Sequence, residues 1–165
     1  MIPVKIHLML NHAPLWGTCF AFLLLVYSLA ARKEDIRKVA LAFSLLVALV
    51  TPAVFFSGEK SEDLVERIPG VVESAIESHE EAGELALTAS LVLAAMAATQ
   101  LLLYLFPSTH RLRGRLAWAF LLVMLAALLA IANTARLGGK IRHTDELGGL
   151  PNWPDKLARS GIFSA

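Results

Sequence analysis

The sequence has a single cysteine and is poor in charged residues. Cys19 alone excludes an intrachain disulfide, a thiolate metal cluster and the CxxCH attachment site of a c-type haem. Charged residues make up 18% and hydrophobic residues 56% of the 165 positions, whereas soluble domains carry about 25% charged residues. This imbalance excludes a soluble enzyme, a disordered protein and a nucleic-acid-binding protein. The formal net charge of +1 gives no reason to expect a polyanionic partner.

The hydrophobic residues are concentrated in four stretches that lack acidic and basic residues altogether. These stretches are residues 13–31, 39–56, 85–106 and 116–133. Each is close to the roughly 20 residues that a helix needs to cross a bilayer. We therefore predict an all-α polytopic membrane protein, an up-and-down four-helix transmembrane bundle. The predicted spans are about 12–31, 38–57, 83–106 and 115–136.

The connections between these spans differ in charge. Residues 32–38 contain four basic and two acidic residues, and residues 107–115 contain three arginines and no acidic residue. The positive-inside rule places such short basic connections in the cytoplasm. The connection between the second and third spans carries nine acidic residues against two basic ones, so we expect it outside together with both termini. This topology predicts a multi-pass protein of the bacterial cytoplasmic (inner) membrane.

The acidic connection is predicted to be an amphipathic, partly helical segment on the extracytoplasmic side. Ser61 is a candidate N-cap for a short helix, and a Pro-Gly pair then ends it. A second helix is expected to begin near Val71 and to lead into the third span. We predict that the transmembrane domain covers residues 1–137, and that residues 138–165, rich in glycine and proline, form an irregular tail lying on the membrane surface.

The predicted topology brings four of the five histidines to the outer membrane face. His7 and His12 lie before or at the start of the first span. His79 opens the third span, and His143 follows the fourth. Only His110 lies among the basic residues of the other face. Imidazoles that are distant in sequence but close in the fold are typical of a metal or haem site.

His79 is the strongest of the four candidate ligands. Small residues lie one turn before it and one turn after it, so its imidazole is predicted to point into the bundle, where an unpaired polar group is costly. We expect His12 to face it across the bundle, although His12 can also be read as a polar helix-end residue. For His7 and His143, an exposed interfacial histidine is an equal alternative.

Other polar residues near this face are candidate supporting groups. Glu80 and Glu84 are alternative additional metal ligands. Asn133 is a candidate hydrogen-bond partner for the site. Arg142 is a candidate partner for the propionates of a bound haem.

Several short motifs together resemble a known bacterial family. They are the opening His-Leu-Met-Leu-Asn-His-Ala-Pro, the Phe-Ser-Gly-Glu segment after the second span, the His-Glu-Glu start of the third, and Leu-Gly-Gly-Lys-Ile-Arg-His after the fourth. This combination resembles a family of predicted four-helix membrane proteins classed as a domain of unknown function. Members of that family are found beside or fused to cytochrome c and Rieske-type domains, so the resemblance implies a redox setting.

Three functions stay open. The first, favoured by the resemblance, is a b-type cytochrome that holds haem b between histidines and passes electrons between a quinol and a soluble or membrane-bound cytochrome. The second is a zinc, copper or iron site, either catalytic or metal-handling, built from the histidines with Glu80 or Glu84. The third is a cofactor-free structural subunit. The lipid bilayer is a partner in all three, and each is compatible with a homo-oligomer or a larger complex.

Overall fold

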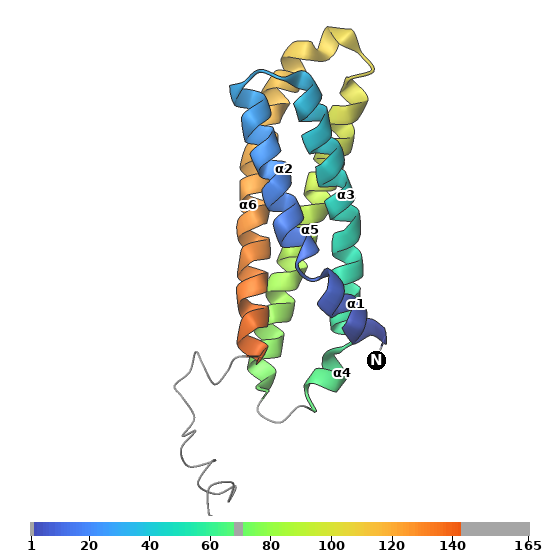
Figure 1. Ribbon diagram of the computed structural model, residues 1–165, viewed down its shortest axis with the longest axis vertical. Helices are drawn as coiled ribbons and strands as arrows, with labels where there is room; N and C mark the ends of the chain where they lie inside the picture. Colours follow the sequence, from blue (N-terminus) through green and yellow to red (C-terminus); the bar gives the residue numbers. More distant parts are fainter. Residues whose placement is uncertain (1, 68–70, 143–165) are drawn as a thin grey trace, which may run out of the picture.

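A computed structural model describes residues 2–67 and 71–142 of the chain, with no description of the Arg142 side chain. Within these ranges the secondary structure is entirely helical. The elements are α1 (Ile2–Leu10), α2 (Ala13–Ala30), α3 (Glu34–Glu59), α4 (Glu62–Val65), α5 (Glu73–Leu103), the 3₁₀ helix η1 (Pro107–Thr109) and α6 (His110–Arg142). The long helices α2, α3, α5 and α6 run alternately up and down and form the bundle (Figure 1).

The two ends of the bundle carry different elements. The lower end in Figure 1 holds α1, α4, the start of α5 and the end of α6, and we call it the histidine end. The upper end holds the α2–α3 turn and η1, and we call it the basic end. The short helix α1 packs against α3. His7 and His79 belong to the histidine end, and His110, the first residue of α6, belongs to the basic end.

The α2–α3 turn shows how the chain reverses direction within three residues. Arg32 has a left-handed φ of 53°. The N–H of Lys33 donates to the Ser28 carbonyl at 2.9 Å, and the N–H of Arg32 donates to the Leu29 carbonyl at 3.4 Å. These two bonds form a Schellman motif, which satisfies the last carbonyls of α2 without a side-chain cap.

Hydroxyl groups inside the bundle are bonded to the backbone of their own helix. Ser44 Oγ donates to the Ala40 carbonyl at 2.7 Å, and Ser90 Oγ donates to the Ala86 carbonyl at 2.8 Å. Such bonds remove polar groups from an apolar surrounding. They also agree with an interior that carries hydroxyls but no charge at mid-depth.

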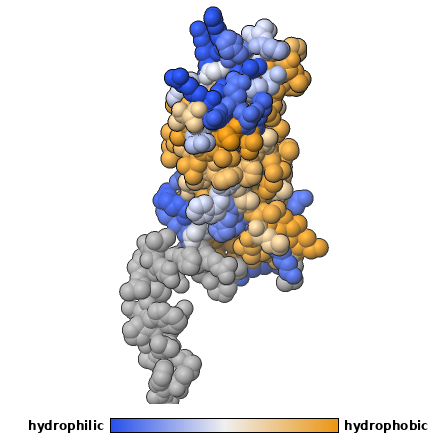
Figure 2. All heavy atoms as spheres, turned by 45° about the horizontal axis from the view of Figure 1, so that its top comes forward, coloured by the Kyte–Doolittle hydropathy of each residue, from blue (hydrophilic) through white to orange (hydrophobic). Residues whose placement is uncertain are grey.

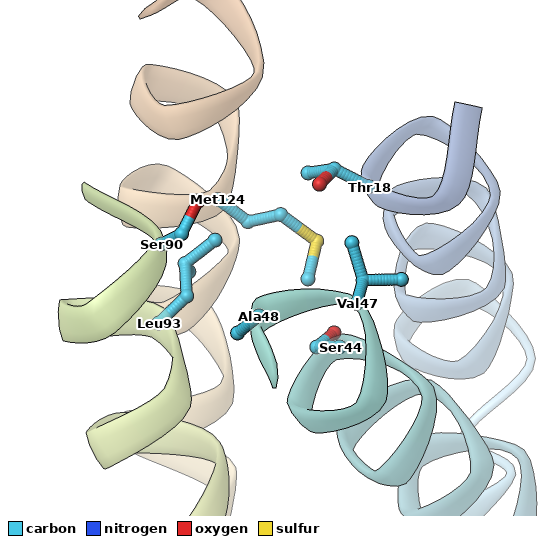
Figure 3. A pocket seen from close by; sticks show the side chains of 7 residues that line it. All are labelled: Thr18, Ser44, Val47, Ala48, Ser90, Leu93 and Met124. Atoms are coloured by element: carbon cyan, nitrogen blue, oxygen red, sulfur yellow. The ribbon is translucent and has the colours of Figure 1, made fainter. Parts of the chain in front are cut away.

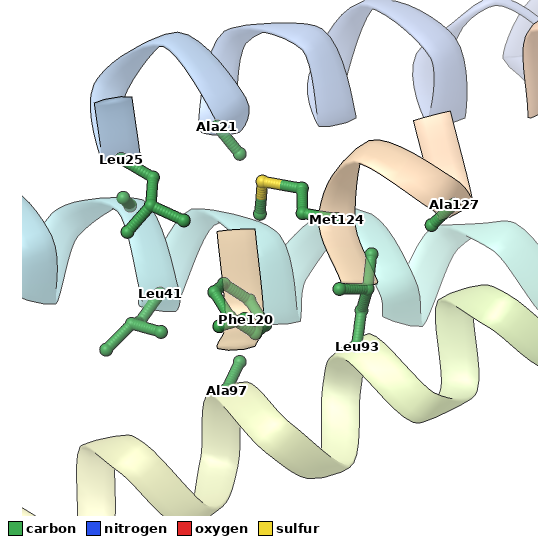
Figure 4. Close-up of a cluster of buried hydrophobic side chains, with 9 residues drawn as sticks. Ala21, Leu25, Leu41, Leu93, Ala97, Phe120, Met124 and Ala127 are labelled. Carbon is green, nitrogen blue, oxygen red and sulfur yellow. The ribbon is translucent and has the colours of Figure 1, made fainter. Parts of the chain in front are cut away.

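The core consists of interdigitated side chains from all four long helices. Phe120 and Met124 of α6 are fully buried in it, beside Leu25 of α2 and Leu41 of α3 (Figure 4). Alanines, among them Ala97 of α5, line the helix contacts. Small residues at such contacts allow the helix backbones to approach closely. In a bilayer the hydrophobic effect does not drive helices together, so this close packing is what favours their association.

The outer surface of the bundle is apolar between two polar ends. Figure 2 shows a hydrophobic band flanked by hydrophilic residues. Large side chains in this band are exposed, for example Leu49 at 68% and Leu122 at 69%. Four helical segments are long and apolar enough to cross a membrane. The predicted all-α four-helix bundle is therefore confirmed, and the exposed band is compatible with contact to a lipid bilayer.

Three local expectations differ from the structure. Helix α6 continues through Gly138 and Gly139 to Arg142, so the irregular tail predicted from residue 138 is wrong for residues 138–142. Helix α5 begins at Glu73, with Val72 at its N-cap, slightly later than expected. Ser61 occupies the N-cap position of α4, but its Oγ donates to the Ser57 carbonyl instead of capping. The rest of the predicted tail lies outside the described residues.

The burial pattern predicts different costs for two leucines of α3. Leu41 is fully buried and Leu46 is 56% exposed. Leu41→Ala should leave a cavity and lower the free energy of unfolding by about 2–5 kcal/mol. Leu46→Ala should cost much less, because lipid or detergent chains replace the lost contacts. Unfolding in detergent by a denaturing surfactant measures both, and equal costs would contradict the assigned faces.

Candidate metal centre

Two histidines from different helices meet at the histidine end. His7 lies on α1 and His79 lies on α5. Their ring centroids are 6.4 Å apart, and the ring planes are nearly perpendicular at 88°. Both side chains are partly buried, so one face of the pair packs on the bundle.

Each imidazole is held by a backbone carbonyl of a neighbouring helix. His7 Nδ1 lies 2.9 Å from the Val54 carbonyl oxygen, and His79 Nδ1 lies 3.0 Å from that of Thr134. A carbonyl oxygen only accepts hydrogen bonds, so Nδ1 must be the donor in both contacts. In a neutral imidazole the other nitrogen, Nε2, then keeps a free lone pair. Histidines that ligate metals are oriented by such bonds.

Each of the two accepting carbonyls is followed, four residues later in the same helix, by a glycine. Val54 is followed four residues later by Gly58, and Thr134 by Gly138. A Cβ on Gly58 would lie 2.9 Å from His7 Cε1, and a Cβ on Gly138 would lie 2.9 Å from His79 Cε1. Side chains on a helix lean toward the preceding turn and cover it. The missing Cβ therefore leaves room for the imidazole to reach the carbonyl.

Thr134 also joins α5 to α6 at this level. Its Oγ1 lies 2.7 Å from the Ala82 carbonyl oxygen of α5 and 3.1 Å from the Ala130 carbonyl oxygen of its own helix. The residue that accepts from His79 is thus itself fixed relative to the helix that carries His79. This arrangement limits the movement of the imidazole.

Carboxylates are concentrated on and around α4 at the histidine end. Burial raises the pKa of Glu62 on α4, and the neighbouring charges of Glu80, Glu66, Asp63 and Glu59 raise it further, in that order. We call these five residues the acidic rim. A cluster of negatively charged side chains raises the local concentration of cations.

The structure places the remaining predicted site residues differently. His12 is exposed at the N-cap of α2 and makes no capping bond, and the described ring contact of His79 is with His7. Asn133 is exposed, and its Oδ1 accepts from Arg136 Nη2 at 2.9 Å. No group of three or more ligand-type side chains gathers within the described part of the chain.

Glu80 and Glu84 differ in their surroundings. Glu80 is partly buried and belongs to the acidic rim, whereas Glu84 is exposed. His143 and the side chain of Arg142, which were also predicted to contribute, lie outside the described residues. Nearby, Asn11 Oδ1 is buried without a hydrogen-bond partner on another described residue.

The site also depends on three residues that the sequence analysis did not identify: Val54, Gly58 and Gly138. Val54 acts through its carbonyl, which every residue has, so no side chain reveals it. The two glycines recur four residues after the accepting carbonyls, and this spacing was the available clue.

The bundle interior is closed above this site. A cavity of about 10 Å³ lies between Thr18, Ser44 and Met124 (Figure 3). This is the volume that about one water molecule occupies. This cavity is too small for a cofactor.

Comparisons with protein families, curated proteins and solved structures found no match.

The glycine contacts predict a difference between two adjacent positions of α6. A Cβ on Gly138 meets His79, whereas a Cβ on Gly139 meets nothing within 4 Å. Gly138→Ala should displace the imidazole and remove its bond to Thr134, while Gly139→Ala should leave it in place. NMR of protein labelled with ¹⁵N-histidine reports the protonated Nδ1 of His79, with His79→Ala to assign it. Loss of this signal in both variants, or in neither, would contradict the geometry.

Proposed function

We propose that the protein is an integral membrane metalloprotein that binds one divalent transition-metal ion through Nε2 of His7 and Nε2 of His79. The observation that carries the proposal is the repeated bond from Nδ1 to a backbone carbonyl. It puts both imidazoles in the tautomer whose Nε2 is a ligand.

The separation of the rings supports a shared ion. An imidazole nitrogen lies about 1 Å from its ring centroid and about 2 Å from a zinc ion that it binds, so two rings facing each other across one ion have centroids roughly 6 Å apart. The observed separation is 6.4 Å.

Zinc, copper and iron are the ions that this chemistry suits, because imidazole binds all three. Glu80 is the carboxylate of the acidic rim next to His79 in the chain, and His143 follows Arg142 directly. We propose these two residues as further ligands. A bound ion supplies Lewis acidity or, for copper and iron, one-electron redox chemistry.

Haem b is the second candidate, because haem iron leaves two axial positions and two imidazoles meet here. In that case the protein transfers electrons, with a quinol or a cytochrome as partner. The acidic rim, however, opposes the negative propionates of haem. The described residues therefore fit an ion better than a haem.

Metal titration of the purified protein in detergent tests the proposal. After treatment with a chelator, the wild type should bind one zinc or copper ion per chain. His7→Ala and His79→Ala should each weaken binding at least about tenfold to a hundredfold. His110→Ala, an exposed histidine of the basic end, is the matched control and should change nothing. Unchanged affinity in His79→Ala would refute the site.

The absorption spectrum separates the two cofactors and the cofactor-free alternative. A Soret band in the protein as isolated that is lost in His79→Ala would identify the cofactor as haem instead of a metal ion. Absence of both a Soret band and saturable metal binding would leave only the structural-subunit function.

We also propose that the histidine end faces the outside of the bacterial inner membrane. The support is the positive charge of the short connections at the basic end. Both described ends of the chain belong to the histidine end (Figure 1).

Cysteine labelling in whole cells tests this orientation. Ser74 lies in the first turn of α5 and Ser108 lies in η1, and both are exposed. In a Cys19→Ala background, Ser74→Cys should react with a membrane-impermeant thiol reagent and Ser108→Cys should not. The reverse pattern would place the histidine end in the cytoplasm.

A further inference from the structure

The basic end contains three buried polar side chains that the proposed metal site does not use. Arg37 is 8% exposed, Arg113 is 7% exposed and Gln100 is 2% exposed. They come from α3, α6 and α5 respectively. Arginine is rarely buried unless it is paired with an acidic or hydrogen-bonding group. The buried glutamine amide likewise needs a hydrogen-bond partner.

Arg113 has a structural role that accounts for part of its guanidinium. Its Nη1 donates to the Leu103 carbonyl at 3.1 Å, near the end of α5. The guanidinium also stacks on the Tyr104 ring, 4.4 Å from the centroid. These contacts hold the Arg113 side chain in place but leave its Nε without a hydrogen-bond partner among the described residues.

Four buried donors in this region have no hydrogen-bond partner on another described residue. They are Arg37 Nε, Arg113 Nε, Gln100 Nε2 and Tyr104 Oη. Tyr104, the C-cap residue of α5, follows Gln100 by one helical turn, so the two share a helix face. Three of the four atoms carry N–H groups, which can only donate. The missing group is therefore an acceptor.

The charge at this position is also unbalanced. Arg37, Lys38, Arg113 and Glu34 are the charged residues around the Tyr104 hydroxyl. The ion pairs found in the described chain are Lys38–Asp35 at 3.0 Å and Arg113–Glu34 at 3.7 Å. Neither includes Arg37. A buried positive charge without a partner is strongly unfavourable, so the acceptor should carry negative charge.

We propose that Arg37, Gln100, Tyr104 and Arg113 form a binding site for a phosphate group. A phosphodiester carries one negative charge and several acceptor oxygens, which match one unpaired guanidinium and four unpartnered donors. The four residues belong to the basic end of the bundle, next to the α2–α3 turn and η1, and the end of a transmembrane bundle lies at the level of lipid headgroups. Basic pockets between transmembrane helices bind phospholipid headgroups in this way.

Thermal unfolding in a phosphate-free detergent tests the site and identifies the source of the phosphate. The probes are dioleoyl phosphatidylglycerol, dioleoylglycerol as the same lipid without phosphate, and inorganic phosphate. Saturable stabilisation by phosphatidylglycerol alone assigns the site to a lipid headgroup. Stabilisation by inorganic phosphate as well assigns it to phosphate from either source. Stabilisation by dioleoylglycerol equal to that by phosphatidylglycerol, or by none of the three, overturns the proposal.

Matched arginine variants separate the site from general attraction between charges. Arg37→Gln should weaken phosphatidylglycerol binding about tenfold to a hundredfold, since it removes the unpaired guanidinium. Arg115→Gln removes the same charge from an exposed position of the same end and should have little effect. Equal loss in both variants would show that only the net charge matters, and the proposal would fail.

Tyr104→Phe keeps the test decisive if Arg37→Gln does not fold. Because the Tyr104 hydroxyl has no described partner, its removal should leave the unfolding temperature of the lipid-free protein unchanged or slightly raised. Binding of phosphatidylglycerol should weaken severalfold. A lower unfolding temperature without lipid, combined with unchanged binding, would show that the hydroxyl supports the fold instead of the ligand.

Discussion

A chain that crosses the hydrocarbon layer has to bond its backbone N–H and C=O groups within itself. This constraint makes the described chain helical, and it limits irregular backbone and charged side chains to the two ends of the bundle. The interior is left with alanine contacts, a few large apolar side chains and hydroxyls bonded to their own helices. Chemistry that needs ionisable groups is therefore found only at the ends, and the two ends carry opposite kinds of chemistry.

At the histidine end, the same constraint supplies the acceptors that orient the imidazoles. A helix carbonyl is already bonded within the helix but retains a second lone pair. A side chain from a neighbouring helix reaches it only where no Cβ covers it. Gly58 and Gly138 provide that access to the Val54 and Thr134 carbonyls. Glycine lowers helix stability by about 1 kcal/mol relative to alanine, so its use inside a helix at both positions indicates that the histidine contacts matter more than helix propensity.

The acidic rim and the arginine cluster show how charge is distributed along the bundle axis. Burial and the neighbouring carboxylates raise the pKa of Glu62, and this cluster of acidic residues marks the histidine end as a region of negative potential. At the other end Arg37 and Arg113 are buried beside Tyr104, with too few acceptors among the described residues. One end thus favours a cation and the other an anion. Both properties follow from named side chains and are independent of each other.

The sequence by itself determined the helical class, the number of spans and the end of the bundle at which His7 and His79 lie. These features depend on composition along the chain and on the bilayer thickness, which are local properties. Tertiary structure decided that His7, and not His12, lies against His79, because α1 is a separate helix that packs on α3. It also placed Gly138 inside α6, where the pair of glycines had indicated an irregular segment. The partners in these contacts are backbone carbonyls and absent Cβ atoms, which no residue type reveals, so only the packing of one helix on another could identify them.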